Sequence, residues 1–190
     1  MPLKRTLRYV ALACGLSFVG LVLYLWYIQA TGNFGTVVEG KVYRSNQITP
    51  ERMAQYQAEH GIRSVLNLRG EKPGEGWYDA EVQAATDLDI QLINFGMSAD
   101  QEVTDEQIDS LLALMRDAPK PMLIHCKSGS DRTGIASTMY LAVIEEVDEE
   151  EAEWQLSLLY GHLPIPILSR AWPMDVSWEY IEVKVLGLLE

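Results

Sequence analysis

The chain contains one stretch that decides its fold, Met122-Leu-Ile-His-Cys-Lys-Ser-Gly-Ser-Asp-Arg-Thr-Gly134. It opens with a short apolar run typical of a buried strand, continues through a polar loop, and leads into residues 133–147, a run compatible with a buried helix. Strand, tight loop and helix gather backbone N–H groups into a concave nest at the helix N-terminus, and such a nest binds an oxyanion the size of phosphate. The stretch therefore predicts an anion site.

Two side chains of this loop carry the predicted chemistry. Cys126 lies at the base of the nest, where a helix N-terminus and nearby cations favour the thiolate over the thiol. Arg132 lies at the far end of the loop, and its planar guanidinium can hold two phosphate oxygens at once. A nucleophile, an anion nest and a bidentate cation so close in sequence predict phosphoryl transfer to cysteine.

The motif resembles a known family. Cys126, five further residues, Arg132 and Thr133, preceded by His125 and an apolar run, resemble the signature loop of the cysteine-based protein tyrosine phosphatases. The form HCKSGSDRTG is most similar to the compact dual-specificity branch, which includes small bacterial secreted or membrane-anchored members. Residues 42–47 and 64–69 resemble the first strands of that branch, so the resemblance covers roughly residues 37–160.

The resemblance implies a role for each residue of the loop. Cys126 is expected to be the nucleophile and Arg132 the phosphate clamp, while the Thr133 hydroxyl supports the thiolate. His125 is expected to orient the loop by hydrogen bonding rather than to act as a base. The remaining residues expected around the bound phosphate are Lys127, Ser128, Gly129, Ser130 and Asp131.

The reaction also needs a proton donor for the leaving oxygen, and a positioned carboxylic acid contributes roughly 10²–10⁴ in rate. The resemblance implies an Asp on a separate loop upstream of the cysteine, and Asp100, on the loop after the apolar run 91–95, fits best. Asp131 is the second candidate, because an Asp just before the loop Arg resembles some phosphoinositide phosphatases. Asp105 is third, since its place in the first turn of a predicted helix already explains an acid there.

The N-terminal segment predicts a membrane anchor. Residues 10–28 carry no charge, and as a helix they span about 28 Å, close to the roughly 30 Å of a bilayer core. Basic residues precede the segment and aromatic residues lie near its far end: Lys4, Arg5, Arg8, Tyr24, Trp26 and Tyr27. The positive-inside rule then places the N-terminus in the cytoplasm and the rest across the inner membrane, in the periplasm of the resembled bacterial members. A cleaved signal peptide is the alternative, disfavoured because its apolar core is normally shorter.

The remaining pattern predicts an α/β domain with a central, mostly parallel sheet flanked by helices. Residues 1–30 are expected to form the anchor, 31–36 a linker and 37–190 the phosphatase domain. The expected strands are 37–43, 64–68, 91–95 and 122–124, and the expected helices are 50–60, one from Trp77, one from the Thr104/Gln107 capping box to before Pro119, 133–147, one after Asp148 with Ala152, Leu156 and Leu159 on its inner face, and 177–186.

Composition limits the partners. The chain has a net charge of −12, and all its charges before Glu39 are three basic residues, so the domain is more acidic still and a poor candidate for nucleic acid. No His, Asp or Cys cluster has the spacing of a metal site, and we expect no cofactor. His162 is expected to be structural, and ordinary loop and core packing is favoured over substrate contact for Arg69, Lys72, Trp77 and Tyr78.

The function predicted is a phosphomonoester hydrolase with a phosphocysteine intermediate, acting on a phosphorylated protein or a small phosphoester. Lys127 and Asp131 favour an inositol or lipid phosphate as the alternative substrate. A rhodanese-like sulfurtransferase also places a Cys in an anion loop, but the Arg-Thr-Gly sequence favours a phosphatase. Intact Cys126 and Arg132 argue against a catalytically silent phosphate-binding module.

Overall fold

The computed structural model describes residues 2–166 and 169–187, and within them the strands form one five-stranded sheet in the order β1-β2-β5-β3-β4. The strands are β1 (Gly35–Val38), β2 (Val42–Ser45), β3 (Ser64–Asn67), β4 (Gln91–Asn94) and β5 (Met122–His125). β1 pairs with β2 antiparallel, and all other neighbouring strands are parallel. The structure therefore confirms the mostly parallel α/β fold, and β5, which leads into the signature loop, is its central strand.

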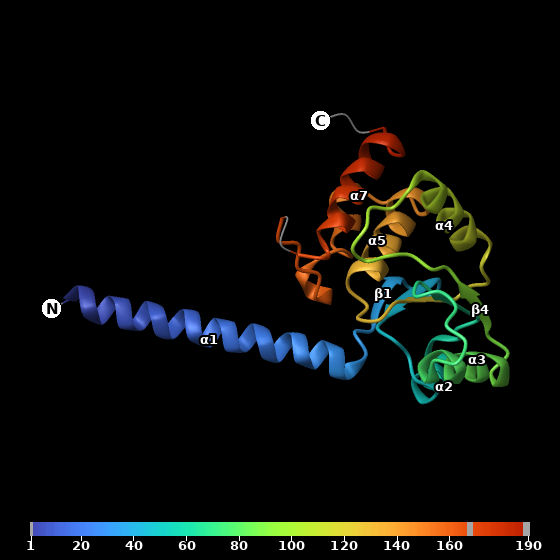
Figure 1. The fold of residues 1–190 in the computed structure, drawn as a ribbon, viewed down its shortest axis with the longest axis horizontal. Coiled ribbons are helices and arrows are strands. Elements are labelled where there is room, and N and C mark those ends of the chain that lie inside the picture. Colours follow the sequence, from blue (N-terminus) through green and yellow to red (C-terminus); the bar gives the residue numbers. More distant parts are fainter. Residues whose placement is uncertain (1, 167–168, 188–190) are drawn as a thin grey trace.

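Helices cover both faces of the sheet. On one face lie α2 (Pro50–His60) and α3 (Gly76–Asp87), and on the other lie α4 (Asp105–Asp117), α5 (Asp131–Met139) and α7 (Trp172–Lys184) (Figure 1). Successive residues of β5 serve opposite faces, as the pleat of a strand requires. Leu123 belongs to the core beneath α2 and α3, whereas Ile124 belongs to the core beneath α4, α5 and α7.

The helix termini form where the sequence predicts them. The Thr49 hydroxyl accepts a hydrogen bond from the Arg52 N–H at the start of α2, and Gly61 ends that helix in the left-handed conformation at φ 68°. At the start of α4, Thr104 and Gln107 form the reciprocal bonds of a capping box. Both caps depend on contacts within a few residues, so they can be predicted from the sequence.

Two predicted elements differ at their boundaries. The single strand predicted at 37–43 is wrong, because the chain turns at Gly40 (φ 70°) and Val38 pairs with Val42 in an antiparallel hairpin. The helix predicted at 133–147 begins at Asp131 and becomes a π-helix over Tyr140–Ile144.

The C-terminal part differs more. The helix after Asp148, α6 (Glu149–Glu153), is short, so Leu159 lies beyond it and is 55% exposed, contrary to the prediction that it packs inward. A 3-10 turn, Leu158–Tyr160, follows instead. The last helix, α7, begins earlier than predicted, at Trp172, because Pro173 is accommodated in its first turn.

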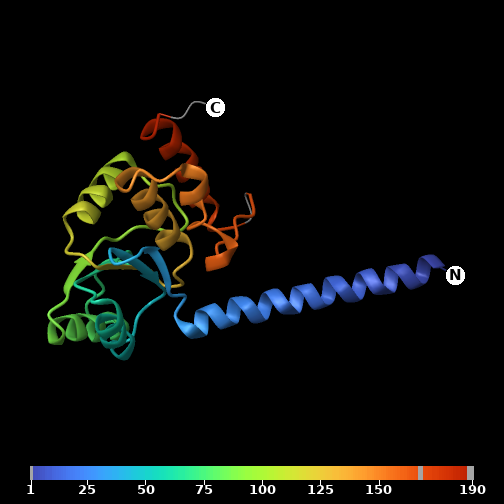
Figure 2. The same ribbon diagram turned by 180° about the vertical axis from the view of Figure 1, so that it is seen from behind.

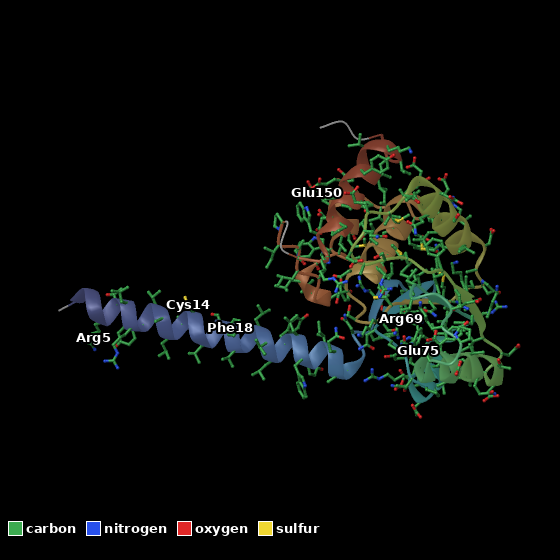
Figure 3. The ribbon with its side chains drawn as sticks, viewed as in Figure 1. Arg5, Cys14, Phe18, Arg69, Glu75 and Glu150 are labelled. Carbon is green, nitrogen blue, oxygen red and sulfur yellow. The ribbon has the colours of Figure 1, made fainter. Side chains whose placement is uncertain are left out.

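The N-terminal helix α1 (Pro2–Thr31) extends away from the sheet (Figures 1 and 2). Its segment Arg5–Thr31 is long and apolar enough to cross a membrane. Almost none of the apolar part of this segment is buried against the rest of the protein. The side chains of Cys14 and Phe18 project from α1 clear of the domain (Figure 3). By length and composition, α1 is suited to be a membrane anchor or a signal sequence.

Candidate active site

The loop between β5 and α5 folds around the thiol of Cys126. That residue is 1% exposed, and the backbone N–H of Gly129 donates to its Sγ over 3.3 Å. Gly129 has φ 73°, and a Cβ atom at this position would lie 2.7 Å from the backbone of Ser45 and Asn46. Only glycine therefore lets the loop curl around the sulfur while it rests against the end of β2.

The first turn of α5 supplies two further donors. One terminal nitrogen of Arg132, Nη1, donates to the carbonyls of Leu68 and Met97, each over 3.2 Å, so the guanidinium joins the loops that follow β3 and β4. Arg132 Nε and the hydroxyl of Thr133 are buried, and neither has a hydrogen-bond partner within the described part of the chain. A buried donor left unpaired costs about 1–3 kcal/mol, so an anion that accepts from these groups is favoured.

A second arginine lies under the loop. Arg44, on β2, is fully buried and donates to the Gly129 carbonyl over 2.6 Å and to the carbonyl and side-chain oxygens of Gln155. Its guanidinium also lies 3.6 Å from the centre of the Tyr160 ring. Burial lowers the pKa of Arg44 to about 10, which leaves it charged at neutral pH. Arg44 was not predicted as a site residue, although a basic residue within the strand-like segment 42–47 is a feature that could have identified it.

His125 is held by a buried carboxylate. Its Nε2 lies 2.8 Å from Oε1 of Glu81, and neither side chain is exposed. Gln47 donates to the other Glu81 oxygen over 2.5 Å. The second ring nitrogen of His125 lies 3.2 Å from the Cys126 carbonyl oxygen, which is where a residue that orients the loop is expected. Glu81 was not predicted as a site residue. It is an acid on the buried face of α3, which it shares with Tyr78, and an acid on the apolar face of a helix could have identified it.

Arg69 lies close to the site as well. Its guanidinium stacks 3.4 Å from the centre of the Trp77 ring and donates to Gln47 over 2.6 Å. Burial, followed by the neighbouring Arg132 cation, lowers the pKa of Arg69. Arg132 bonds the carbonyl of Leu68, the residue just before Arg69, so both arginines lie at this end of the sheet. Tyr78, by contrast, is buried and accepts a hydrogen bond from Asn94, and Lys72 is exposed.

Asp100 lies on the loop that begins where Met97 accepts from Arg132. Asp100 is three positions beyond Met97 in the chain, so the two residues are at most about 10 Å apart. The Asp100 carboxylate accepts hydrogen bonds from Ser98 and from Arg170. These contacts, the Ser98 bond first, lower the pKa of Asp100. The ionised form of Asp100 is therefore stabilised in this conformation.

The other two candidate acids are engaged elsewhere. Asp131 accepts from Nδ1 of His162 over 2.8 Å, and Nε2 of His162 lies 3.0 Å from Asp175 on α7. Burial alone would lower the pKa of His162, but its hydrogen bonds to the two carboxylates outweigh burial and raise the pKa to about 9. Asp105 pairs with Lys184 of α7, and that hydrogen bond is the largest cause that lowers the pKa of Asp105. Both acids thus join α7 to the rest of the domain.

The end of α1 also contacts the catalytic loop. Gln29 and Asn33 each donate a side-chain hydrogen bond to the Ser128 carbonyl over 2.9 Å. Asn33 donates in addition to the Tyr160 carbonyl over 2.8 Å, and the Ser130 hydroxyl donates to the same oxygen over the same distance. Lys127, which lies between Cys126 and Ser128 in the loop, is exposed.

No group of three or more His, Cys, Asp or Glu side chains that could hold a metal ion is present among the described residues.

A thiol enclosed by a strand-loop-helix turn, with an Arg and a Thr in the first helical turn, is the arrangement of the cysteine-dependent phosphatases. The sequence matches, over residues 29–162, the family described as DSP-PTPase phosphatase fused to NAD+ Kinase. The chain belongs to this dual-specificity phosphatase-like family, as the resemblance of the signature loop predicted. The rhodanese-like alternative receives no support from the match.

Solved structures show the same fold. TpbA of P. aeruginosa is similar with a TM-score of 0.60 at 20% identity, covering 83% of this chain and 89% of that one. A cysteine-to-serine variant of TpbA bound to phosphotyrosine gives 0.60 at 19% identity, covering 82% and 88%. The catalytic domain of the PP-IP phosphatase SIW14 of S. cerevisiae, in complex with citrate, gives 0.58 at 22% identity, covering 83% and 94%. No curated protein matches the sequence.

Proposed function

We propose that this protein is a phosphatase that hydrolyses phosphomonoesters through a phosphocysteine intermediate. The observation that carries the proposal is the Gly129 N–H directed at the buried Cys126 sulfur, with the unpaired donors of Arg132 and Thr133 in the adjoining turn. The thiolate is the form of cysteine that attacks phosphorus.

The reaction follows in two steps. The Cys126 sulfur attacks phosphorus, so that an S–P bond forms as the P–O bond to the leaving group breaks, and Asp100 gives the leaving oxygen its proton. The loop N–H groups and Arg132 stabilise the negative charge on the three phosphoryl oxygens in the transition state. Water then attacks the phosphocysteine, the Asp100 carboxylate takes a proton from that water, and the thiolate leaves with release of inorganic phosphate.

As the proton donor, Asp100 has to be in its acid form when the substrate is bound. The carboxylate is bound to Ser98 and Arg170, and both contacts favour its ionised form, whereas the first step needs the acid form. Arg170 is 88% exposed, so water can replace its contact at little cost. Asp100 therefore exchanges Arg170 for the leaving oxygen of the substrate before it donates its proton.

A phosphorylated protein is the leading substrate, and the phosphotyrosine bound to the TpbA variant is an example of that class. A second class is supported by the charge of the site. Arg69 beside Arg132, with Lys127 exposed on the loop, provides more positive charge than one phosphate needs. That surplus favours an inositol or lipid phosphate, and the PP-IP phosphatase SIW14 has the same fold. Comparing kcat/KM for a phosphotyrosine peptide and an inositol phosphate separates the two.

We also propose that α1 is an uncleaved inner-membrane anchor, with its N-terminus in the cytoplasm and the catalytic domain, from about residue 37, in the periplasm. The support is that Gln29 bonds the catalytic loop and Tyr24 donates to the Leu159 carbonyl, so the end of α1 is part of the domain's packing. A reporter that is active only outside the cytoplasm, fused after Glu190, should be active, and the protein should resist extraction by high salt. Release of a shortened protein would instead identify a cleaved signal.

The phosphatase activity is tested with the full chain in detergent micelles and an aryl phosphate as substrate. Cys126→Ser should abolish turnover while inorganic phosphate still binds, because the loop N–H groups and Arg132 remain. The matched control is Cys14→Ser, which changes the exposed thiol of α1 and should leave turnover unchanged. Turnover that survives in Cys126→Ser would refute the phosphocysteine mechanism.

A further inference from the structure

One segment of the domain is apolar, uncharged and exposed. Between Glu153 and Arg170 the sequence contains no Asp, Glu, Lys or Arg, although the chain as a whole carries a net charge of −12. Trp154, at the start of this segment, is 63% exposed, and four large aliphatic side chains beyond it are between 41% and 55% exposed: Leu158, Leu159, Leu163 and Ile165. We call these four residues the apolar patch.

The one histidine of the segment does not add charge to its surface. His162 has no exposed area, and both of its ring nitrogens are bound to carboxylates, those of Asp131 and Asp175. Asp131 and Asp175 come from α5 and α7, so the charge of His162 is balanced inside the domain. The outward side of the segment therefore presents apolar surface without a charge.

The segment lies alongside the end of α1. The Tyr24 hydroxyl donates to the Leu159 carbonyl over 2.6 Å. A Cβ atom on Gly161 would lie 3.3 Å from Ile28 and 3.6 Å from Leu25, so the chain passes directly against the helix there. In Figures 1 and 2 the segment, drawn in orange, projects from the domain on the side from which α1 leaves.

We propose that the apolar patch is a second membrane contact, which enters the interfacial region of the same bilayer that α1 crosses. The proposal rests on the proposed role of α1 as an uncleaved anchor. Tyr24, which bonds the segment, and the exposed Trp26 and Tyr27 form an aromatic belt of the kind that marks the interface, so the patch lies at headgroup level. Apolar groups at this level bury themselves about 5–10 Å into the boundary between headgroups and acyl chains.

The contact also fixes where the catalytic loop lies. Gln29, which bonds Ser128 of the loop, is five residues beyond Tyr24, a rise of about 7–8 Å along the helix. With α1 and the patch both in the bilayer, the domain is held at two places rather than on a single flexible tether. The catalytic loop therefore stays within about one to two helical turns of the headgroups.

Depth-dependent fluorescence quenching tests the proposal on the full chain, reconstituted into vesicles of phosphatidylethanolamine and phosphatidylglycerol. Both native cysteines are replaced, by Cys14→Ser and Cys126→Ser, and one cysteine is introduced for an environment-sensitive fluorophore. Leu159→Cys and, independently, Leu163→Cys report the patch, and Val19→Cys reports α1. Val82→Cys on α3, an exposed apolar residue across the sheet, is the matched control.

Phospholipids that carry a nitroxide near the headgroup should quench the labels at 159 and 163 several-fold more than the label at 82, and phospholipids that carry the nitroxide near the end of the acyl chain should quench the label at 19. Quenching at 19 but none above the control at 159 and 163 would overturn the membrane contact and leave the anchor intact. Absence of quenching at 19 would overturn both. Self-quenching at 159 that disappears on dilution with unlabelled protein would show that a second copy covers the patch, and this also overturns the proposal.

Discussion

His162 should make the stability of this protein depend on pH in a way that the structure predicts in sign and size. The imidazole is buried between Asp131 and Asp175 and joins the signature loop to α7. Its two carboxylate partners raise the pKa of His162 to about 9, against an ordinary value of 6.5. The folded protein thus holds this proton more tightly than the unfolded chain does.

The sign follows from linkage. Below about pH 6.5, His162 is protonated in both states, and its ion pairs contribute fully to the free energy of unfolding. As the pH rises towards about 9, the unfolded chain loses the proton first and the contribution declines. Since one pKa unit corresponds to about 1.4 kcal/mol, the whole contribution is about 3 kcal/mol, lost at about 1.4 kcal/mol per pH unit.

The assay is urea unfolding of the full chain in detergent micelles, followed through tryptophan fluorescence, because Trp178 on α7 is buried. The informative quantity is the free energy of unfolding of the unmodified protein minus that of His162→Gln, which can accept and donate hydrogen bonds but cannot ionise. This difference should fall by about 3 kcal/mol between about pH 6 and 9.5. His60→Gln, on α2, is the control and should keep the pH dependence. A difference that stays constant over this range would refute the reasoning.

Two further predictions concern the reaction. Asp100→Asn should lower the rate on phenyl phosphate by about 10²–10⁴, and much less on a substrate whose leaving group is acidic enough to depart unprotonated. If this dependence on the leaving group is seen in Asp131→Asn and not in Asp100→Asn, the proton donor is Asp131 in the signature loop. Gln29→Ala removes one of two side-chain donors to the Ser128 carbonyl, worth about 0.5–1.5 kcal/mol, and should lower kcat/KM by up to about tenfold. Gln55→Ala, an exposed glutamine on α2, is its control, and equal kinetics in the two variants would show that α1 does not support the loop.

The parts of the fold that could be predicted are those specified locally. The signature loop is contiguous in sequence, so Cys126 and Arg132 and the strand-loop-helix turn could be read together. The caps at Thr49 and Thr104 depend on residues at fixed short spacings. The alternation of strands and helices predicted a mostly parallel sheet with the signature loop at the end of a central strand, but it did not predict the order of the strands.

The parts that could not be predicted depend on contacts between distant residues. Arg44 supports the Gly129 carbonyl across 85 positions, and Glu81 meets His125 across 44. Neither spacing has a periodic signature, because the pairing is set by the way β2, α3 and β5 pack. The exposed Leu159 was misassigned for a related reason, since apolar spacing alone does not distinguish a side chain that faces the core from one that faces another partner.

The contacts between α1 and the signature loop couple the position of this helix to the geometry around Cys126. The Ser128 carbonyl accepts from Gln29 and Asn33, and the Tyr160 carbonyl accepts from Asn33 and from Ser130. A shift of α1 relative to the domain would therefore reach the loop that holds Cys126. A long linker would have isolated the site from α1. Because the hydrogen bonds are made instead within the last turn of α1 and just after it, the position of that helix relative to the domain is a determinant of the geometry around Cys126.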